Sequence, residues 1–141
     1  MDKTKKYAAI IIIVLAAVLV ISAVLNKQGL DERKEMLIDA KIIIKVNGEE
    51  VGVATFEDIK SVGEEEFESV LDTADTEPQT FSYTGVQIKN LLAKYNVDLS
   101  NSKAVILMAV DGYTVAYNAD EVLQEGNIYI AYKRDGEVLQ T

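Results

Sequence analysis

One aspartate and two tyrosines have the types and spacing best suited to a ligand site in this chain. Tyr113 and Tyr117 lie four residues apart in YTVAY, a segment typical of a strand. Alternation along a strand would place both rings on one face, just after Asp111 in an Asp-Gly turn. Such a group could bind an aromatic compound or a carbohydrate. The same spacing also fits core tyrosines that bury the ring and leave the hydroxyl in water.

A second group of candidate ligands is acidic. Asp72, Asp75 and Glu77 cluster beside the only proline of the chain. A calcium loop needs oxygen ligands at alternating positions, and Ala74 and Thr76 interrupt that pattern. We therefore expect a solvated loop here and no metal site.

Several residue types are absent, and their absence excludes whole classes of chemistry. The 141 residues include no cysteine, histidine or tryptophan. Without cysteine there is no disulfide, thiolate nucleophile or thiolate metal ligand. Without histidine there is no Ser-His-Asp triad and no ordinary zinc site. No glycine-rich phosphate loop, GxSxG or HExxH motif occurs either, so we expect no catalytic residues.

The charge of the chain is strongly negative. Fourteen basic and 23 acidic residues give a net charge of −9. Residues 1–27 carry +3, so −12 falls on the remainder. That charge argues against nucleic acid and against anionic lipid headgroups as partners. It fits either simple solubility or an acidic docking face.

An uncharged run near the start predicts the location of the protein. Residues 8–25 read AAIIIIVLAAVLVISAVL, and 18 residues at about 1.5 Å each reach roughly 27 Å, close to the thickness of a bilayer core. Lys3, Lys5 and Lys6 precede the run and favour a cytoplasmic N-terminus. A cleaved signal peptide is the alternative, but its apolar core would be shorter, and Ile21-Ser22-Ala23 is a poor cleavage site. We expect a single-pass protein of the cell membrane with its domain outside.

Three segments are expected: residues 1–27 with the cytoplasmic lysines and the transmembrane signal anchor, a juxtamembrane stalk over residues 28–40, and one small extracytoplasmic domain over residues 41–141. Alternating apolar residues around Asn47-Gly48 indicate a hairpin. Helices are expected over residues 56–63, 86–97 and 119–124, with Thr55 capping the first and Asn118 capping the last. The second would carry one apolar stripe, formed by Val86, Ile88, Leu91, Leu92 and Tyr95. Strands are expected over 67–73, 113–117, 127–133 and 137–141, and a buried strand over 102–110. Interleaved strands and short helices predict an α+β fold with a mixed sheet, following one N-terminal transmembrane helix.

The order of several short motifs resembles a known family. Thr84-Gly85-Val86-Gln87-Ile88 precedes a Leu-Leu helix, Asp111-Gly112-Tyr113 opens a strand, and Ala131-Tyr132 leads into Asp135-Gly136-Glu137. Over residues 42–139 this order is similar to that of the sulfite-oxidase-like, molybdopterin-binding oxidoreductase domain. The resemblance implies a small mixed-sheet domain of that type. Family members continue beyond the Asp-Gly-Glu turn, which suggests a truncated member or a fragment.

The chain departs from this family in the residues that carry its chemistry. In the family's enzymes a cysteine thiolate ligates molybdenum, and arginines and histidines hold the pterin phosphate and the substrate. Here the only arginines are Arg33 and Arg134, and the negative charge would repel a phosphate-bearing cofactor. Tyr113 falls where those enzymes carry an active-site tyrosine, but the same turn recurs in members that look non-catalytic. We expect no cofactor, with molybdopterin as the alternative.

These observations together predict a bacterial-type, membrane-anchored extracytoplasmic domain that is not an enzyme. It would act as a ligand-binding or partner-binding module, with a membrane protein or a redox complex as the partner. The first alternative is a subunit of a molybdopterin-dependent oxidoreductase. The second is a purely structural accessory domain.

Overall fold

The computed structural model describes the backbone of residues 3–139. It describes the side chains of residues 14–139, apart from those of residues 30, 33 and 34. The chain divides into two compact units, residues 1–36 and residues 37–141.

The first unit is formed by helix α1, Lys3–Ile38. The helix is continuous across the expected boundary between residues 1–27 and the stalk of residues 28–40. Its described part is rich in alanine and leucine, which favour a helix. Ala40 N donates to Leu37 O at 3.1 Å where the helix ends.

The structure contradicts the prediction of a transmembrane helix. Among the residues that the structure describes, no helix carries a stretch long and apolar enough to cross a membrane. The side chains of Lys3, Lys5 and Lys6 lie outside the described residues.

The second unit begins with the predicted hairpin. Strand β1, Lys41–Val46, pairs antiparallel with β2, Glu49–Thr55. The turn residues Asn47 and Gly48 both have positive φ, 52° and 88°, which is the geometry that the Asn-Gly pair favours. One face of the hairpin is buried through Ile44 and Ala54.

Helix α2, Phe56–Ser61, follows directly and confirms the predicted cap at Thr55. The Thr55 hydroxyl accepts from Asp58 N, and the Asp58 carboxylate accepts from Thr55 N in return. This reciprocal capping box satisfies donors that the first turn of a helix leaves free. The helix contacts β2 and β4 and buries Ile59.

The largest sheet has four strands in the order β3-β4-β7-β8. Their bounds are β3 Glu65–Thr73, β4 Thr76–Gln87, β7 Tyr129–Arg134 and β8 Glu137–Val138. The predicted mixed sheet is wrong: every described strand pair is antiparallel, and the strands form three separate sheets. Short turns join the strands of each hairpin, and such turns connect only antiparallel neighbours. The unit still combines helices and strands in one small domain.

Strand β4 occupies residues for which no strand was predicted, and the helix that follows it is shorter than predicted. Helix α3, Ile88–Lys94, begins two residues later than expected because Val86 and Gln87 still pair with β7. Pro78 lies inside β4, where the register with β3 shifts. A bulge tolerates proline because one residue there makes no ladder hydrogen bond.

Strands β5, Ala104–Met108, and β6, Thr114–Asn118, form the third sheet, and helix α4, Ala119–Leu123, follows with Asn118 as its cap.

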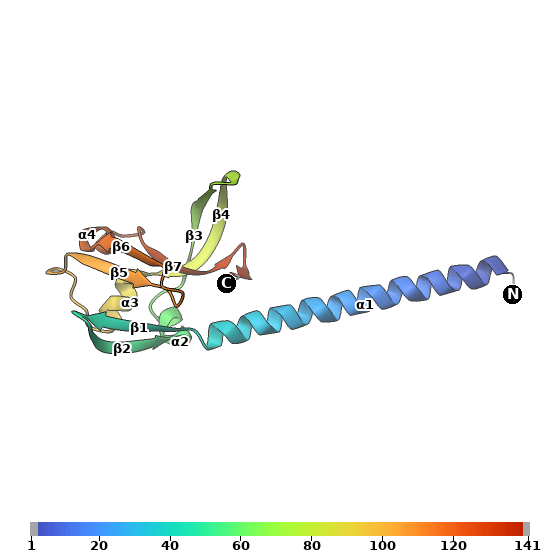
Figure 1. Cartoon of the computed structure of the whole chain (residues 1–141), viewed down its shortest axis with the longest axis horizontal. Coiled ribbons are helices and arrows are strands. Elements are labelled where there is room, and N and C mark those ends of the chain that lie inside the picture. The colour runs from blue at the N-terminus through green and yellow to red at the C-terminus, as the bar shows by residue number, and fades with distance from the viewer. Residues whose placement is uncertain (1–2, 140–141) are drawn as a thin grey trace. The chain divides into compact units, whose positions relative to one another are not determined.

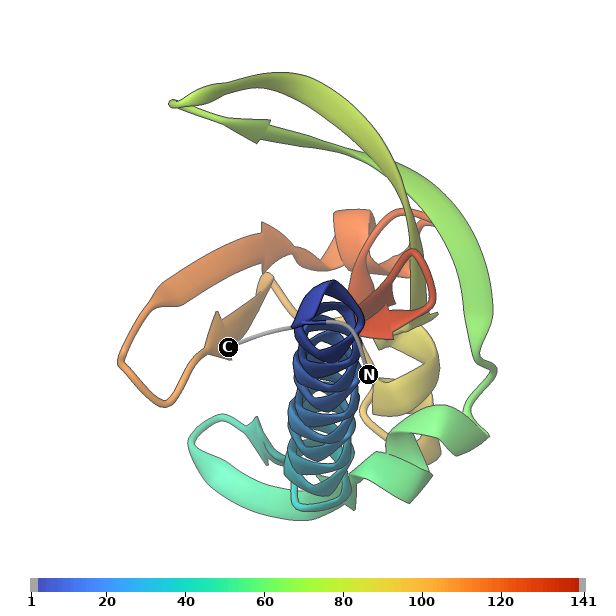
Figure 2. The same cartoon turned by 90° about the vertical axis from the view of Figure 1, so that its right-hand side faces the viewer.

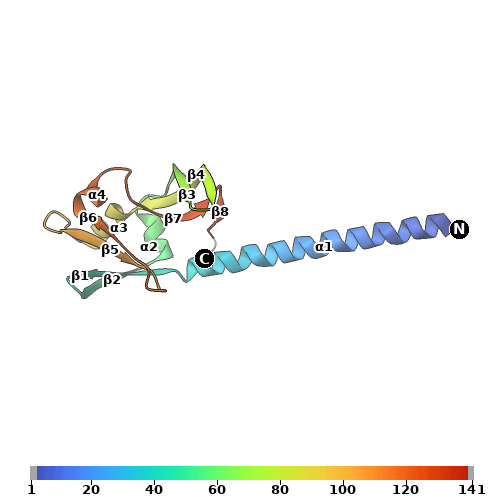
Figure 3. The ribbon, with the colours of Figure 1, turned by 45° about the horizontal axis from the view of Figure 1, so that its top comes forward.

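Two clusters form the core. The first lies around Val86 and Leu91, and the second around Ile88 and Val122. Helix α3 contributes to both, and Figure 3 shows α2 and α3 among the β1–β2, β3–β4 and β5–β6 hairpins.

Candidate binding surface

The inward face of the β5–β6 hairpin attaches it to the domain. Val105, Leu107 and Tyr117 are half-buried and pack against the second core cluster. Val105 pairs with Tyr117, and Leu107 pairs with Val115, so these side chains share one face. A two-stranded sheet is marginally stable in water alone, and this packing supplies the support that it needs.

The outward face of the same hairpin is also apolar. Ile106 and Met108 are 63% and 73% exposed. Ala116 lies opposite Ile106, and Thr114 lies opposite Met108. The sequence predicted a buried strand over residues 102–110, and that prediction is wrong for this face. An antiparallel sheet with one solvated face normally carries polar residues there.

The tip of the hairpin extends the apolar surface. Val110 is exposed and Tyr113 is 70% exposed. The tip is held by its own backbone: Ala109 N donates to Tyr113 O at 2.8 Å, and Gly112 N donates to Ala109 O at 3.0 Å. Gly112 has a φ of 88°, a conformation that side chains of other residues disfavour. We call Ile106, Met108, Val110 and Tyr113 the β5–β6 surface.

The three predicted site residues do not form one group. Asp111 and Tyr113 meet in the turn, where Asp111 Oδ1 accepts from Tyr113 N at 2.9 Å. Tyr113 precedes β6, so the alternation of that strand does not fix its direction. Tyr117 lies on the inward face with the second core cluster. The carboxylate of Asp111 therefore orders the turn, and only Tyr113 contributes to the exposed surface.

Charged residues are scarce on this hairpin. Between Lys103 and Asp120 the only charged residue is Asp111, although the chain as a whole is rich in acids. The centre of a protein interface is typically depleted in charged residues and enriched in methionine and aromatic residues. Sequence reasoning missed Ile106 and Met108 because AVILMAV is apolar at every position and gives no alternation to read.

A buried glutamine organises a separate polar network between β4 and the loop after α4. Gln87 Nε2 donates to Glu65 Oε1 at 2.8 Å and to Glu125 Oε1 at 2.7 Å, and Gly126 N donates to Gln87 Oε1 at 2.9 Å. Lys89 pairs with Glu125, and this pairing, with the Gln87 hydrogen bond, lowers the pKa of Glu125. All polar atoms of the Gln87 amide group have partners, so the network fixes the loop.

The acidic candidates lie at the end of the β3–β4 hairpin. Asp72, Asp75 and Glu77 are all exposed there. Within the described part of the chain, no group of three or more acidic side chains is placed to hold a metal ion.

Comparison with known proteins identifies no relative: no protein-family model, no curated protein and no solved structure matches this chain. The resemblance to the sulfite-oxidase-like domain therefore stays a prediction from its motifs.

Proposed function

We propose that the globular unit of residues 37–141 is a non-catalytic protein-binding module, and that the β5–β6 surface is its contact with the partner. One observation carries this proposal. Ile106 and Met108 extend from the outward face of a sheet whose inward face already packs on the core. Apolar side chains gathered on an exposed face mark interaction sites more often than chance exposure does.

The energetics support a specific contact. Burying an aliphatic side chain of the size of isoleucine or methionine contributes about 1.5–3 kcal/mol. The fixed turn at Asp111 and Gly112 presents Val110 and Tyr113 without a large loss of backbone entropy on binding.

The partner is a different protein that presents an apolar patch. A second copy of this chain is disfavoured because each copy carries a net charge of −9. The resemblance to a redox family supports a redox protein as the partner class.

The test is site-specific photo-crosslinking of the full chain in the cells that produce it. A photoreactive residue at position 108 should yield an adduct with one partner protein, identified by mass spectrometry. The same residue at position 45 is the control, since Lys45 is also exposed but lies on a different hairpin. Equal adducts at both positions, or an adduct only with a second copy of the chain, would contradict the proposal.

Substitution gives a second measurement. Ile106→Glu with Met108→Glu should abolish the adduct formed from a photoreactive residue at Tyr113. Both side chains face outward, so the melting temperature should change by only a few degrees. An adduct of unchanged yield in a folded double variant would remove the β5–β6 surface from the interface.

A further inference from the structure

Strand β3 is the edge strand of the largest sheet. It pairs with β4 on one side, and no strand among the described residues pairs with its other side. Figures 1 and 2 show the far part of the β3–β4 hairpin extending away from the rest of the globular unit. Residues 68–80 are exposed on both faces. The outer edge therefore offers unpaired backbone donors and acceptors to another chain.

The two faces of β3 differ in chemistry. Strand alternation places Glu66, Glu68, Val70 and Asp72 on one face and Glu65, Phe67, Ser69 and Leu71 on the other. On the acidic face β4 adds small hydroxyl side chains, since Glu66 pairs with Thr84 and Glu68 pairs with Ser82. A strand added beside β3 would thus meet three carboxylates and Val70 on one face, and Phe67 and Leu71 with Ser69 between them on the other.

The apolar face is already ordered by ring contacts. Phe67 stacks on Tyr83 with ring centroids 5.9 Å apart and on Tyr129 at 3.9 Å. Phe81 meets the Tyr83 ring edge-on at 6.4 Å. These rings are half-buried and packed against each other. They would therefore lose little conformational entropy when an apolar side chain of a partner packs on them.

The negative charge of this segment determines which kind of strand could pair with β3. Residues 61–88 contain seven carboxylates and no lysine or arginine, and the cations Lys133 and Arg134 lie on β7, on the far side of β4. Pairing of β3 with β3 of a second copy would place like charges beside each other, which is destabilising. Lysine or arginine at every second position of an incoming strand would instead lie beside Glu66 and Glu68.

We propose that the outer edge of β3 binds an extended segment of a partner protein in which basic and apolar residues alternate. Backbone hydrogen bonds along the edge would supply affinity, and the two faces would supply specificity. This site is distinct from the β5–β6 surface, and the inference does not rest on the function proposed for that surface.

The test is titration of the purified full chain with three synthetic peptides. The first is an octapeptide of alternating lysine and valine. The second has the same composition with the four lysines placed before the four valines. The third has the alternating order with every backbone amide methylated, which removes its donors. We expect the first to bind at least tenfold more tightly than the other two.

Two pairs of variants locate the site. Glu66→Gln with Glu68→Gln should weaken binding of the alternating peptide at least tenfold. Glu49→Gln with Glu50→Gln is the control, because it removes the same charge from the exposed β1–β2 hairpin. Ile106→Glu with Met108→Glu should leave binding unchanged, which separates this site from the β5–β6 surface.

Each contrary result would overturn the inference. Equal affinity for all three peptides would show charge attraction without strand pairing. Absence of binding by the alternating peptide would show that the carboxylates only protect the edge from pairing. An equal loss in the control pair would place the binding elsewhere on the acidic surface.

Discussion

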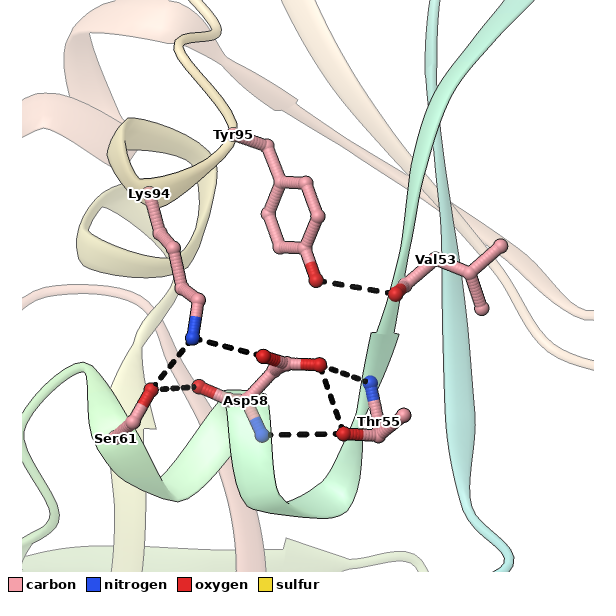
Figure 4. A network of polar contacts seen from close by, with 6 residues as sticks. All are labelled: Val53, Thr55, Asp58, Ser61, Lys94 and Tyr95. Atoms are coloured by element: carbon pink, nitrogen blue, oxygen red, sulfur yellow. Dashed lines mark hydrogen bonds and ion pairs between the residues drawn. The ribbon is translucent and has the colours of Figure 1, made fainter.

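Lys94 and Asp58 connect the end of helix α3 to the first turn of helix α2. Lys94 Nζ lies 2.8 Å from Asp58 Oδ1, and it also donates to Ser61 Oγ at 2.8 Å (Figure 4). The other carboxylate oxygen, Oδ2, accepts from Thr55 N at 3.1 Å and from Thr55 Oγ1 at 2.8 Å. The Asp58 side chain thus caps its own helix, α2, and through Lys94 it also holds the end of helix α3. The Lys94 hydrogen bond, followed by those from Thr55, holds the pKa of Asp58 well below its usual range.

This lowered pKa predicts a loss of stability in acid. A carboxyl group whose folded pKa is depressed stabilises the fold above its unfolded pKa of about 3.9, and the contribution is lost as the pH falls toward the folded pKa. Asp58→Asn should therefore lower the melting temperature at pH 7 by a few degrees. The difference from the parent chain should shrink steadily as the pH falls below about 4. Thermal unfolding followed by circular dichroism at several pH values measures both.

Glu57→Gln is the matched control for that prediction, since Glu57 lies beside Asp58 in the same turn of α2. Its melting temperature should differ little from that of the parent chain at every pH. A difference for Asp58→Asn that stays constant from pH 7 to pH 2 would refute the role of its ionisation.

A substitution at Leu91 tests how much the side chains of α3 contribute to the stability of the core. Its side chain is only 2% exposed and belongs to the first core cluster. Leu91→Ala should lower the free energy of unfolding by about 2–5 kcal/mol because it leaves a cavity. Leu123→Ala makes the same change at a residue that is 46% exposed, and it should cost much less. Urea titration compares the two, and equal losses would contradict the burial of Leu91.

Much of the fold could be predicted where local signals are strong. Asn47-Gly48 forms the turn of the first hairpin, Thr55 caps α2, and Asn118 caps α4. Each depends on interactions between residues close in sequence. The predicted stripe is buried at Val86, Ile88 and Leu91 and half-buried at Leu92 and Tyr95, although Val86 lies in β4 and not in the helix.

The remaining features depend on distant pairing. The long β4 could not be predicted because Pro78 and the polar residues near it read as a turn, and only the bulge opposite β3 accommodates them. The outward face of Ile106 and Met108 was missed for a similar reason. Which side of a uniformly apolar strand meets the core is decided by the packing of its partner residues.

Gly85 marks a close approach of β4 to β7. A Cβ atom at this position would lie 2.3 Å from Ile130 O and 2.9 Å from Ala131 Cα, and both are backbone atoms that cannot move aside easily. Gly85→Ala should therefore destabilise the globular unit by about 1–3 kcal/mol. Gly29→Ala is the control, since nothing lies within 4 Å of its added Cβ. Chemical denaturation monitored by tyrosine fluorescence measures both, and an unaltered stability in Gly85→Ala would mean that β7 can shift.

The molybdenum content of the purified protein distinguishes the two readings of its resemblance to the sulfite-oxidase-like domain. Oxo-transfer enzymes of the family that this chain resembles hold the metal through a cysteine thiolate, and this sequence has neither cysteine nor histidine. Carboxylates and hydroxyls are hard ligands and replace a soft thiolate poorly. The purified full chain should therefore contain far less than one molybdenum atom per chain by elemental analysis, and it should show no sulfite-dependent electron transfer. Tyr113→Phe should change neither measurement, since Tyr113 is exposed at the tip of a hairpin. Stoichiometric molybdenum that persists through gel filtration, with an activity that Tyr113→Phe removes, would establish the oxidoreductase alternative, because a hydroxyl group would then support chemistry that the family assigns to cysteine and arginine.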